Sequence, residues 1–287
     1  MTNDTTQYTR AGTSRFITTP GWKLHYHEAG AEDASPVLFL HGSGPGASAW
    51  ANFRLNIDSI AEHHRVLMLD QPGWGLSDPM EQSEGGHGAA LLQFLDALAI
   101  EKVTLVGNSL GGVNSVAFTV AHPERVERLI TMGTPDISAS DTYSPAGYTL
   151  GLGEVYRGYS DRTVEGFRRL VDVMTFDDRF LADDLIEERL TEALRHEHHL
   201  DAFLARAQAG NQAMPWTAAD LAAITQETLV IHGRDDRVVT LEAGMRLFSR
   251  IPNSRALIFN QCGHWTQIER AAEFNTAVLD FLAPTRR

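Results

Sequence analysis

Cysteine is almost absent from this sequence, with Cys262 the only one in 287 residues. A single cysteine excludes a disulfide within the chain and fits a reducing compartment, so we expect a cytoplasmic protein. Long apolar runs are also missing, and residues 1–15 are polar, without the apolar core of a signal peptide. From these absences we expect neither a membrane span nor a secretion signal.

Basic residues are scarce as well. The chain has 24 Lys and Arg against 37 Asp and Glu, which gives a formal net charge of −13. Nucleic acids and anionic membrane surfaces bind basic faces, so we expect neither as a partner.

Metal-binding motifs of a known type are missing too. His196, His198 and His199 stand close together, but no cysteine or carboxylate pattern surrounds them, which favours a solvated helix end over a metal site. The glycine-rich loop 41–46 lacks the Lys-Ser/Thr ending of a phosphate-binding loop. We therefore expect no bound metal or cofactor.

Short apolar runs alternate with segments whose apolar residues recur at helical spacing. This alternation predicts an α/β fold with a mostly parallel central sheet and helices on both faces. A Pro20-Gly21 turn adds a hairpin over 15–19 and 22–28. The expected strands are 37–40, 65–70, 103–106, 126–132, 229–231 and 256–259, and the expected helices are 88–99, 113–121 and 270–282.

The pattern changes between residues 137 and 216, where strand signals disappear. Charged helical segments at 164–174, 183–196 and 199–208 replace them. We expect a helical cap over 137–216, inserted into a core domain formed by 1–136 and 217–287. Strand-rich segments before and after one helical block favour a single core with an insertion over two independent domains.

The sequence Gly107-Asn108-Ser109-Leu110-Gly111 directly follows the expected strand 103–106 and precedes the expected helix 113–121. Gly-x-Ser-x-Gly at such a junction is typical of a nucleophile elbow, in which small neighbours allow a strained serine to project from a sharp turn. The alternative is a glycine-rich turn whose serine only caps the helix.

A nucleophilic serine needs a histidine base and a carboxylate that orients the histidine. The turn after strand 229–231 carries Asp235 and Asp236, and His264 follows the last expected strand. Ser, then Asp, then His is the chain order of α/β-hydrolases. The glycines of loop 41–46 would also let backbone N–H groups approach an oxyanion.

Arg189 is ambiguous from spacing alone. It lies on the margin of an apolar stripe in the segment from Asp183. Its default position is with its charge in water, and the alternative is a cleft where it holds an anionic substrate. The expected stripe consists of Leu185, Ile186, Leu190 and Leu194.

Several motifs together resemble the meta-cleavage product hydrolases, carbon–carbon bond hydrolases of bacterial aromatic and steroid degradation within the α/β-hydrolase superfamily. The resemblance runs from about Ser14 to Leu282 and is weak across the expected cap. It rests on Leu40-His41-Gly42-Ser43-Gly44-Pro45-Gly46-Ala47, Ala49-Trp50-Ala51-Asn52, Gly107-Asn108-Ser109-Leu110-Gly111-Gly112, Gly233-Arg234-Asp235-Asp236-Arg237 and Cys262-Gly263-His264-Trp265.

The resemblance implies roles for individual residues. The acid is the third residue after the glycine of the turn, which makes it Asp236, with Ser109 as nucleophile and His264 as base. Asp235 is then a turn or surface ion-pair residue. The backbone N–H groups of Ser43 and Leu110 would form the oxyanion hole. Substrate contacts would come from Arg189, Asn108, Trp265, Gly44, Asn52 and Trp216, with Met174, Phe176 and Met214 as further candidate pocket walls.

The implied substrate is an anionic 2-hydroxy-6-oxohexa-2,4-dienoate, cleaved to 2-hydroxypenta-2,4-dienoate and a carboxylic acid. The resemblance also suggests a homodimer or larger homo-oligomer. A carboxylesterase or lactonase with the same triad is the enzymatic alternative, and a non-catalytic ligand-binding receptor is the alternative from another class. The C6 substituent and the choice between a covalent acyl-enzyme and a base-activated water stay open.

Overall fold

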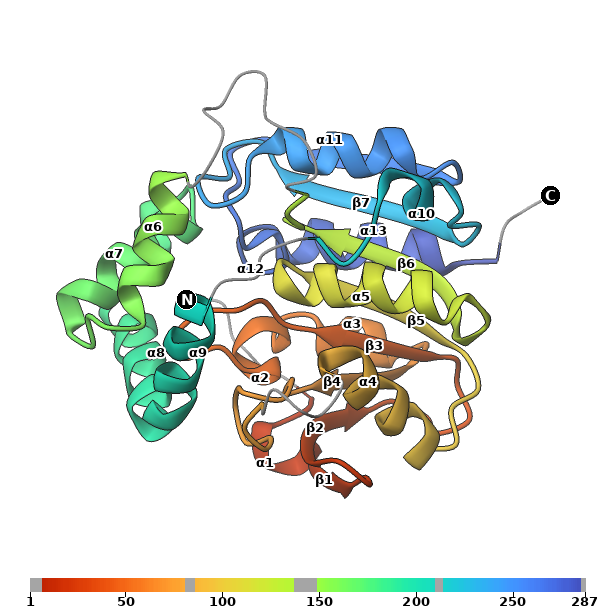
Figure 1. Cartoon of the computed structure of the whole chain (residues 1–287), viewed down its shortest axis with the longest axis horizontal. Coiled ribbons are helices and arrows are strands. Elements are labelled where there is room, and N and C mark those ends of the chain that lie inside the picture. The colour runs from red at the N-terminus through yellow and green to blue at the C-terminus, as the bar shows by residue number, and fades with distance from the viewer. Residues whose placement is uncertain (1–6, 81–85, 137–148, 210–213, 285–287) are drawn as a thin grey trace.

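The computed structural model describes residues 7–80, 86–136, 149–209 and 214–284. Eight strands form one sheet in the order β1-β2-β4-β3-β5-β6-β7-β8 (Figure 1). The β1–β2 and β2–β4 pairs are antiparallel and the other pairs are parallel, so the predicted mostly parallel sheet is confirmed. The strands are β1 (Ser14–Thr18), β2 (Lys23–Ala29), β3 (Pro36–Leu40), β4 (Arg65–Leu69), β5 (Val103–Asn108), β6 (Val126–Met132), β7 (Glu227–Gly233) and β8 (Ser254–Phe259).

The register brings the carboxyl ends of the parallel strands to one edge. Leu40 pairs with Leu69 on one side and with Gly107 on the other, and Gly233 pairs with Phe259. The loops that follow β3, β4, β5, β7 and β8 therefore leave the sheet at the same edge, where ligand sites of such sheets lie.

Side chains of the central strands alternate between two cores. Leu38 and Leu40 face one apolar cluster with Phe94 of α4, while Val37 and Phe39 face the other. This alternation on a strand buried on both faces explains why helices cover both sides. The first face carries α4 (Gly86–Ala97), α5 (Leu110–Ala121), α10 (Ala218–Ala222) and α11 (Leu241–Arg250), and the second carries α2 (Ala49–Phe53), α3 (Ile57–Ala61) and α13 (Ala271–Leu282).

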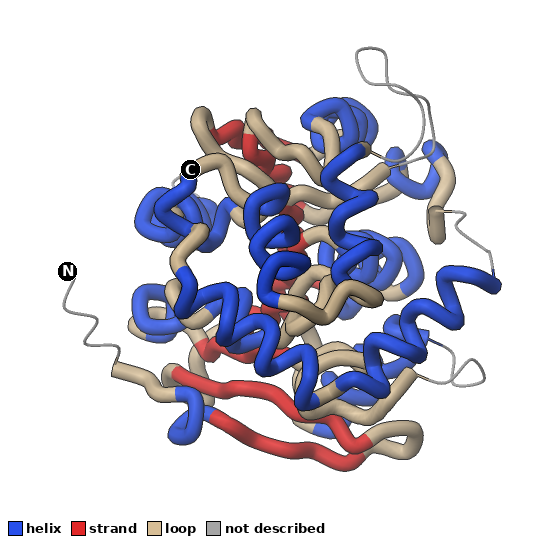
Figure 2. Tube along the Cα trace, turned by 90° about the vertical axis from the view of Figure 1, so that its left-hand side faces the viewer, coloured by secondary structure: helices blue, strands red, loops and turns tan. Residues whose placement is uncertain are grey.

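Four of the described helices that follow β6 in the chain pack on one another. They are α6 (Leu150–Gly158), α7 (Val164–Met174), α8 (Asp183–Arg195) and α9 (Glu197–Ala209). Their apolar residues share a cluster with Val238 and Trp265 from loops of the core. Figure 1 shows them as a group beside the sheet, and Figure 2, viewed from that side, shows them in front of it.

The remaining helices are short. They are α1 (Arg10–Thr13), α12 (Thr266–Glu269) and two 3₁₀ turns at Pro123–Arg125 and Asp178–Phe180. None of the helices in the described ranges is long and apolar enough to cross a membrane.

Two expectations about burial were wrong. Leu194 of the predicted apolar stripe is 44% exposed, whereas Arg189 is only 3% exposed. The buried side of α8 is therefore partly polar, because it faces the loops after β3 and β8 and not a uniform apolar core. His25 and His27 of β2 are also buried, and their rings contact those of Phe16 and Trp50.

Candidate active site

Ser109 has the backbone geometry of a nucleophile elbow. Its φ of 52° and ψ of −116° are strained for a residue with a side chain. The turn is held by a hydrogen bond from the Ser109 N–H to the Met132 carbonyl, 2.9 Å long. Small neighbours are required, because a Cβ on Gly107 would lie 2.4 Å from the Gly111 carbonyl oxygen. Ser109 also makes no side-chain capping hydrogen bond to the described helix α5, which speaks against a role as helix cap alone.

The turn after β7 and the loop after β8 bring a carboxylate to a histidine. His264 Nδ1 lies 2.8 Å from Asp236 Oδ2. The other oxygen, Oδ1, accepts the N–H groups of Val238 at 2.8 Å and Val239 at 2.9 Å. Burial by itself raises the pKa of Asp236, but the charge of His264 and hydrogen bonds from His232 and His264 hold that pKa well below its usual range. Asp236 is thus a fixed carboxylate that orients the imidazole.

Asp235 has a different partner. Its carboxylate pairs with the Arg234 guanidinium at 3.2 Å, and both side chains are partly exposed. The predicted assignment of Asp235 to a turn ion pair is confirmed by this contact.

The imidazole of His264 lies against the exit of β6. Gly133, the first residue after that strand, has a φ of 53°, and a Cβ there would lie 2.9 Å from ring atoms of His264. The residue before it, Met132, holds the N–H of Ser109. Ser109 and His264 therefore both lie beside the end of β6, and Gly133 leaves the room that the imidazole occupies.

The loop after β3 has a fixed conformation. The Gln71 N–H donates to His41 Nε2 at 3.0 Å, so Nδ1 carries the proton and donates to the Gly42 carbonyl at 2.8 Å. Burial lowers the pKa of His41, which keeps the ring neutral. Gly42 faces the elbow, since a Cβ there would lie 3.1 Å from Ser109 Cβ. Ser43 and Gly44 follow directly, so the loop carries backbone N–H groups next to the serine.

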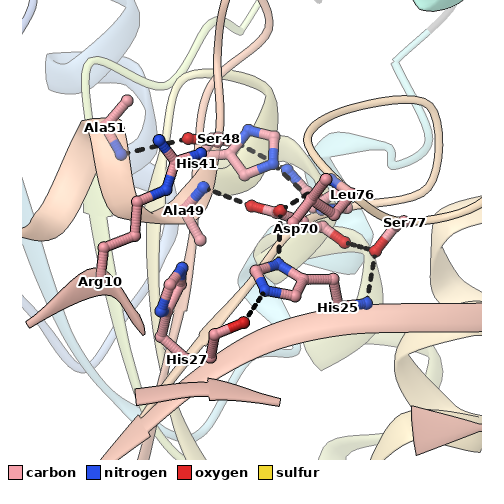
Figure 3. Close-up of polar contacts among 12 residues, drawn as sticks. Arg10, His25, His27, His41, Ser48, Ala49, Ala51, Asp70, Leu76 and Ser77 are labelled. Atoms are coloured by element: carbon pink, nitrogen blue, oxygen red, sulfur yellow. Dashed lines mark hydrogen bonds and ion pairs between the residues drawn. The ribbon is translucent and has the colours of Figure 1, made fainter. Parts of the chain in front are cut away.

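The buried carboxylate of Asp70 holds the end of the loop after β3 (Figure 3). Asp70 Oδ1 accepts the N–H of Ala49, the first residue of α2, at 2.7 Å, and Oδ2 accepts the N–H of Leu76 at 2.9 Å. His25 Nδ1 lies 2.7 Å from Oδ2. Burial opposes ionisation, but the hydrogen bond and charge of His25 lower the pKa of Asp70 to about 2. Sequence patterns gave no sign of this network, because its members come from three separate segments, which are β2, the start of α2 and the loop after β4.

Arg189 reaches the site from α8. Its Nη2 donates to the Ala51 carbonyl and to Asn52 Oδ1, both at 3.2 Å. The guanidinium carbon lies 4.4 Å from the centroid of the Trp265 ring. Burial, with repulsion from Arg54, lowers the pKa of Arg189 to about 10, so the group stays cationic at neutral pH. Its Nε is buried without a hydrogen-bond partner, and no carboxylate within the described ranges pairs with it.

Asn108 is fully buried between the strand ends. Its Nδ2 donates to the Met132 carbonyl at 3.3 Å, while Oδ1 has no hydrogen-bond partner among the described residues. A Cβ on Gly42 would lie 2.9 Å from that oxygen. This acceptor is therefore buried against the loop after β3 and has no partner among the described residues.

The candidate pocket walls are spread over different places. Met174 is buried in the cluster of the α6–α9 helices that contains Trp265. Trp216 and Met214 instead join the core cluster under α4 and α5. Phe176 is 44% exposed, so its side chain lies largely outside the packed interior.

Of the two histidines of α9, His198 is exposed as expected and His199 is not. His199 is 3% exposed, which contradicts the expected solvated helix end for this residue, and burial lowers its pKa to about 4. Its ring centroid lies 4.0 Å from that of His198. Within the part of the chain that the structure describes, no group of three His, Cys, Asp or Glu side chains is arranged to hold a metal.

Comparison with known proteins agrees with this geometry. A profile of the α/β hydrolase fold family matches residues 35–271. The 2-hydroxy-6-oxononadienedioate/2-hydroxy-6-oxononatrienedioate hydrolase of Cupriavidus pinatubonensis is 41% identical over 282 residues, which cover 96% of each chain. The chain belongs to the meta-cleavage product hydrolases of the α/β-hydrolase family.

Solved structures of this family superpose on most of the chain. The meta-cleavage product hydrolase CumD from Pseudomonas fluorescens IP01 has a TM-score of 0.82 at 31% identity, covering 93% of this chain and 96% of its own. The 2-hydroxy-6-oxo-6-phenylhexa-2,4-dienoate hydrolase of Rhodococcus sp. RHA1 has a TM-score of 0.82 at 25% identity, covering 94% and 99%. The chain is accordingly a carbon–carbon bond hydrolase and not a non-catalytic receptor.

Proposed function

We propose that the substrate is a 2-hydroxy-6-oxohexa-2,4-dienoate whose C1 carboxylate binds Arg189. The observation that carries this proposal is the buried cation itself. An ester needs no anion site beside the serine, whereas a dienoate brings a carboxylate that would supply the charge partner. Arg189 would hold this end of the substrate together with Asn52, Asn108, Trp265 and Gly44.

The need for a held dienoate follows from the chemistry. Breaking the C5–C6 bond releases a carbanion, which is prohibitive unless its charge spreads into the rest of the leaving fragment. If the proton of the 2-hydroxyl is first transferred to C5, the fragment leaves as a dienolate with its negative charge on the 2-oxygen. The cationic guanidinium of Arg189 at this end would stabilise that charge as it develops.

The triad would then carry out the acyl step. His264, oriented by Asp236, takes the proton of Ser109 as its Oγ attacks the C6 ketone, and the backbone N–H groups of Ser43 and Leu110 stabilise the oxyanion. Collapse of this adduct expels the dienolate, which takes the proton from His264 to give 2-hydroxypenta-2,4-dienoate, and leaves an acyl-serine beside a neutral imidazole. Water, activated by His264, hydrolyses the ester and releases the carboxylic acid. We favour this covalent route because the elbow geometry suits a nucleophile.

The helices of residues 137–216 would act as a cap over the site, since Arg189 belongs to α8 while its acceptors Ala51 and Asn52 belong to the core. Residues 137–148, where the proposed cap begins, and residues 210–213, shortly before its end at 216, lie outside the described residues. Trp216 as a substrate contact stays a prediction, because its packing is with the core. We also propose that the protein is a homo-oligomer and that it is cytoplasmic. Light scattering of the purified protein tests the oligomeric state.

A panel of dienoates that differ only at C6 tests the substrate. The relatives include enzymes named for a C6 chain with a second carboxylate and for a C6 phenyl group. We expect cleavage of at least one member. Cleavage is measured as loss of the dienoate absorbance and as recovery of both products. A Ser109→Ala protein is the matched blank, and failure of the wild type on every member would refute the proposal.

A further inference from the structure

Glu269 is a buried carboxylate that neither the triad nor the substrate contacts use. It is the last residue of α12 and only 5% exposed. Its Oε1 accepts the N–H of Gly263 at 2.7 Å, and its Oε2 accepts the N–H of Phe176 at 2.7 Å. The N–H of Asp177 approaches Oε2 at 3.4 Å. Each oxygen therefore serves a different segment, one next to His264 and one directly after α7.

Further contacts join the same two segments. The N–H of His264 itself donates to the carbonyl of Met174, the last residue of α7, at 2.8 Å, and the N–H of Trp265 approaches that carbonyl at 3.3 Å. The packing leaves little room, since a Cβ on Gly263 would lie 2.8 Å from the Met174 carbonyl oxygen and 3.0 Å from Glu269 Oε1.

No Lys, Arg or His within the described ranges forms an ion pair with the Glu269 carboxylate. Burial raises the pKa of Glu269, and the N–H bonds from Phe176, Gly263 and Asp177 work against that rise. A buried carboxylate without a cation is costly unless hydrogen bonds satisfy it. The burial of this carboxylate is explained if it holds two backbone segments in a fixed relative position.

We propose that Glu269 is a positioning residue that fixes the His264 loop against the end of α7. The loop carries both the catalytic base and Trp265, on which Arg189 stacks. One carboxylate thus sets the imidazole and the substrate-binding ring relative to the proposed cap. This inference rests on the proposed function for its link to the dienoate, but the link to His264 depends only on the triad.

The test compares Glu269→Gln with Glu273→Gln, which removes the same charge four residues later, in α13. Glu273 is exposed and pairs with Arg270 at 3.3 Å, so it is a matched control. In Glu269→Gln one carboxylate oxygen becomes an NH₂ group, which faces an N–H donor and cannot accept its bond. We expect kcat for the dienoate to fall about tenfold to a hundredfold, with a much smaller change in KM.

Two measurements separate positioning from simple stability. The first is the rate at which a fluorophosphonate labels Ser109, which reports the competence of the serine and its base without any dienoate. The second is amide hydrogen exchange over 174–178 and 261–266. Positioning predicts slower labelling by a factor similar to that in kcat, with faster exchange in both segments, and no change in Glu273→Gln.

The outcomes are distinct. Glu269→Gln protein that labels and turns over at wild-type rates, with only a lower melting temperature, would overturn the proposal. If the glutamine variant does not fold, Glu269→Asp, which keeps the charge one methylene shorter, is judged by the same labelling rate. If wild type cleaves no dienoate yet its Ser109 labelling depends on Glu269, the substrate assignment fails and the positioning role stands.

Discussion

The guanidinium of Arg189 lies over the ring of Trp265, with 4.4 Å between the guanidinium carbon and the ring centroid. One residue comes from α8 and the other directly follows His264. The group proposed to bind the substrate carboxylate is therefore stacked on the loop that carries the proposed base. Binding and chemistry are joined through one contact, and changes to either residue should affect both.

Removing the nucleophile should separate binding from turnover. We expect Ser109→Ala to lower kcat by a factor on the order of 10⁴ or more, because no other group takes over the attack on the ketone. Binding of the dienoate, measured by spectroscopic titration, should persist, since the contacts at Arg189 remain. Turnover within tenfold of wild type would show that Ser109 is not the nucleophile.

The adjacent carboxylates give an internal control. Asp236→Asn removes the acceptor that orients His264, and we expect kcat to fall by a factor on the order of 10⁴. Asp235→Asn breaks an exposed pair with Arg234, which contributes little, and we expect a change of less than about threefold in the same assay. A larger loss at Asp235 than at Asp236 would reverse the assignment.

The elbow should not tolerate a side chain at Gly111. A Cβ there would lie 2.0 Å from the Leu40 carbonyl oxygen, so the strand or the helix must move. We expect Gly111→Ala to lower the free energy of unfolding by about 3 kcal/mol in urea titrations. Gly88→Ala, in α4 with no atom within 4 Å, is the control and should stabilise by about 0.5–1 kcal/mol. Equal effects at both glycines would contradict the packing described.

Stability should fall on mild acidification because of buried neutral histidines. Burial lowers the pKa of His27 from 6.5 to about 4. Between these values the unfolded chain binds a proton that the folded chain does not, so the free energy of unfolding decreases as pH falls through this window. Asp70, with a pKa lowered from 3.8 to about 2, contributes only below this range.

Replacing His27 measures its contribution to the pH dependence of the free energy of unfolding. Between pH 7.5 and pH 5, urea unfolding of His27→Gln should show a loss about 2 kcal/mol smaller than that of wild type. His63→Gln changes an exposed histidine and should leave the loss unaltered. Identical pH dependence in all three proteins would mean that His27 is not held neutral by burial.

The sequence predicted what depends on local patterns. The alternation of strands and helices and the strained Ser109 between two glycines follow from spacing along the chain, whereas the choice of Asp236 over Asp235 came from the family resemblance. The confirmed strand β6 and helix α7 match the expected ranges 126–132 and 164–174. These features depend on side-chain periodicity and on turn residues, and both are determined by residues close together in the sequence.

Contacts between distant segments were not predictable in the same way. Spacing favoured the surface for Arg189, with a substrate cleft as the alternative, and the family resemblance favoured the ligand role. The structure buries it because acceptors on α2 and a ring after β8 meet it there. Glu269 and Asp70 were missed for the same reason, since their partners are backbone N–H groups of segments far away in the chain.

The selectivity of Arg189→Gln shows whether the buried guanidinium recognises the dienoate. The measurement is kcat/KM for a cleaved dienoate divided by kcat/KM for an uncharged 4-nitrophenyl ester. A lost charged hydrogen bond corresponds to about 10- to 150-fold, so we expect this ratio to fall by about that factor. Arg54→Gln, which removes a nearby partly exposed arginine paired with Glu188, should keep the wild-type ratio. A ratio in Arg189→Gln equal to that of wild type would contradict the account, because the buried cation would then not recognise the dienoate.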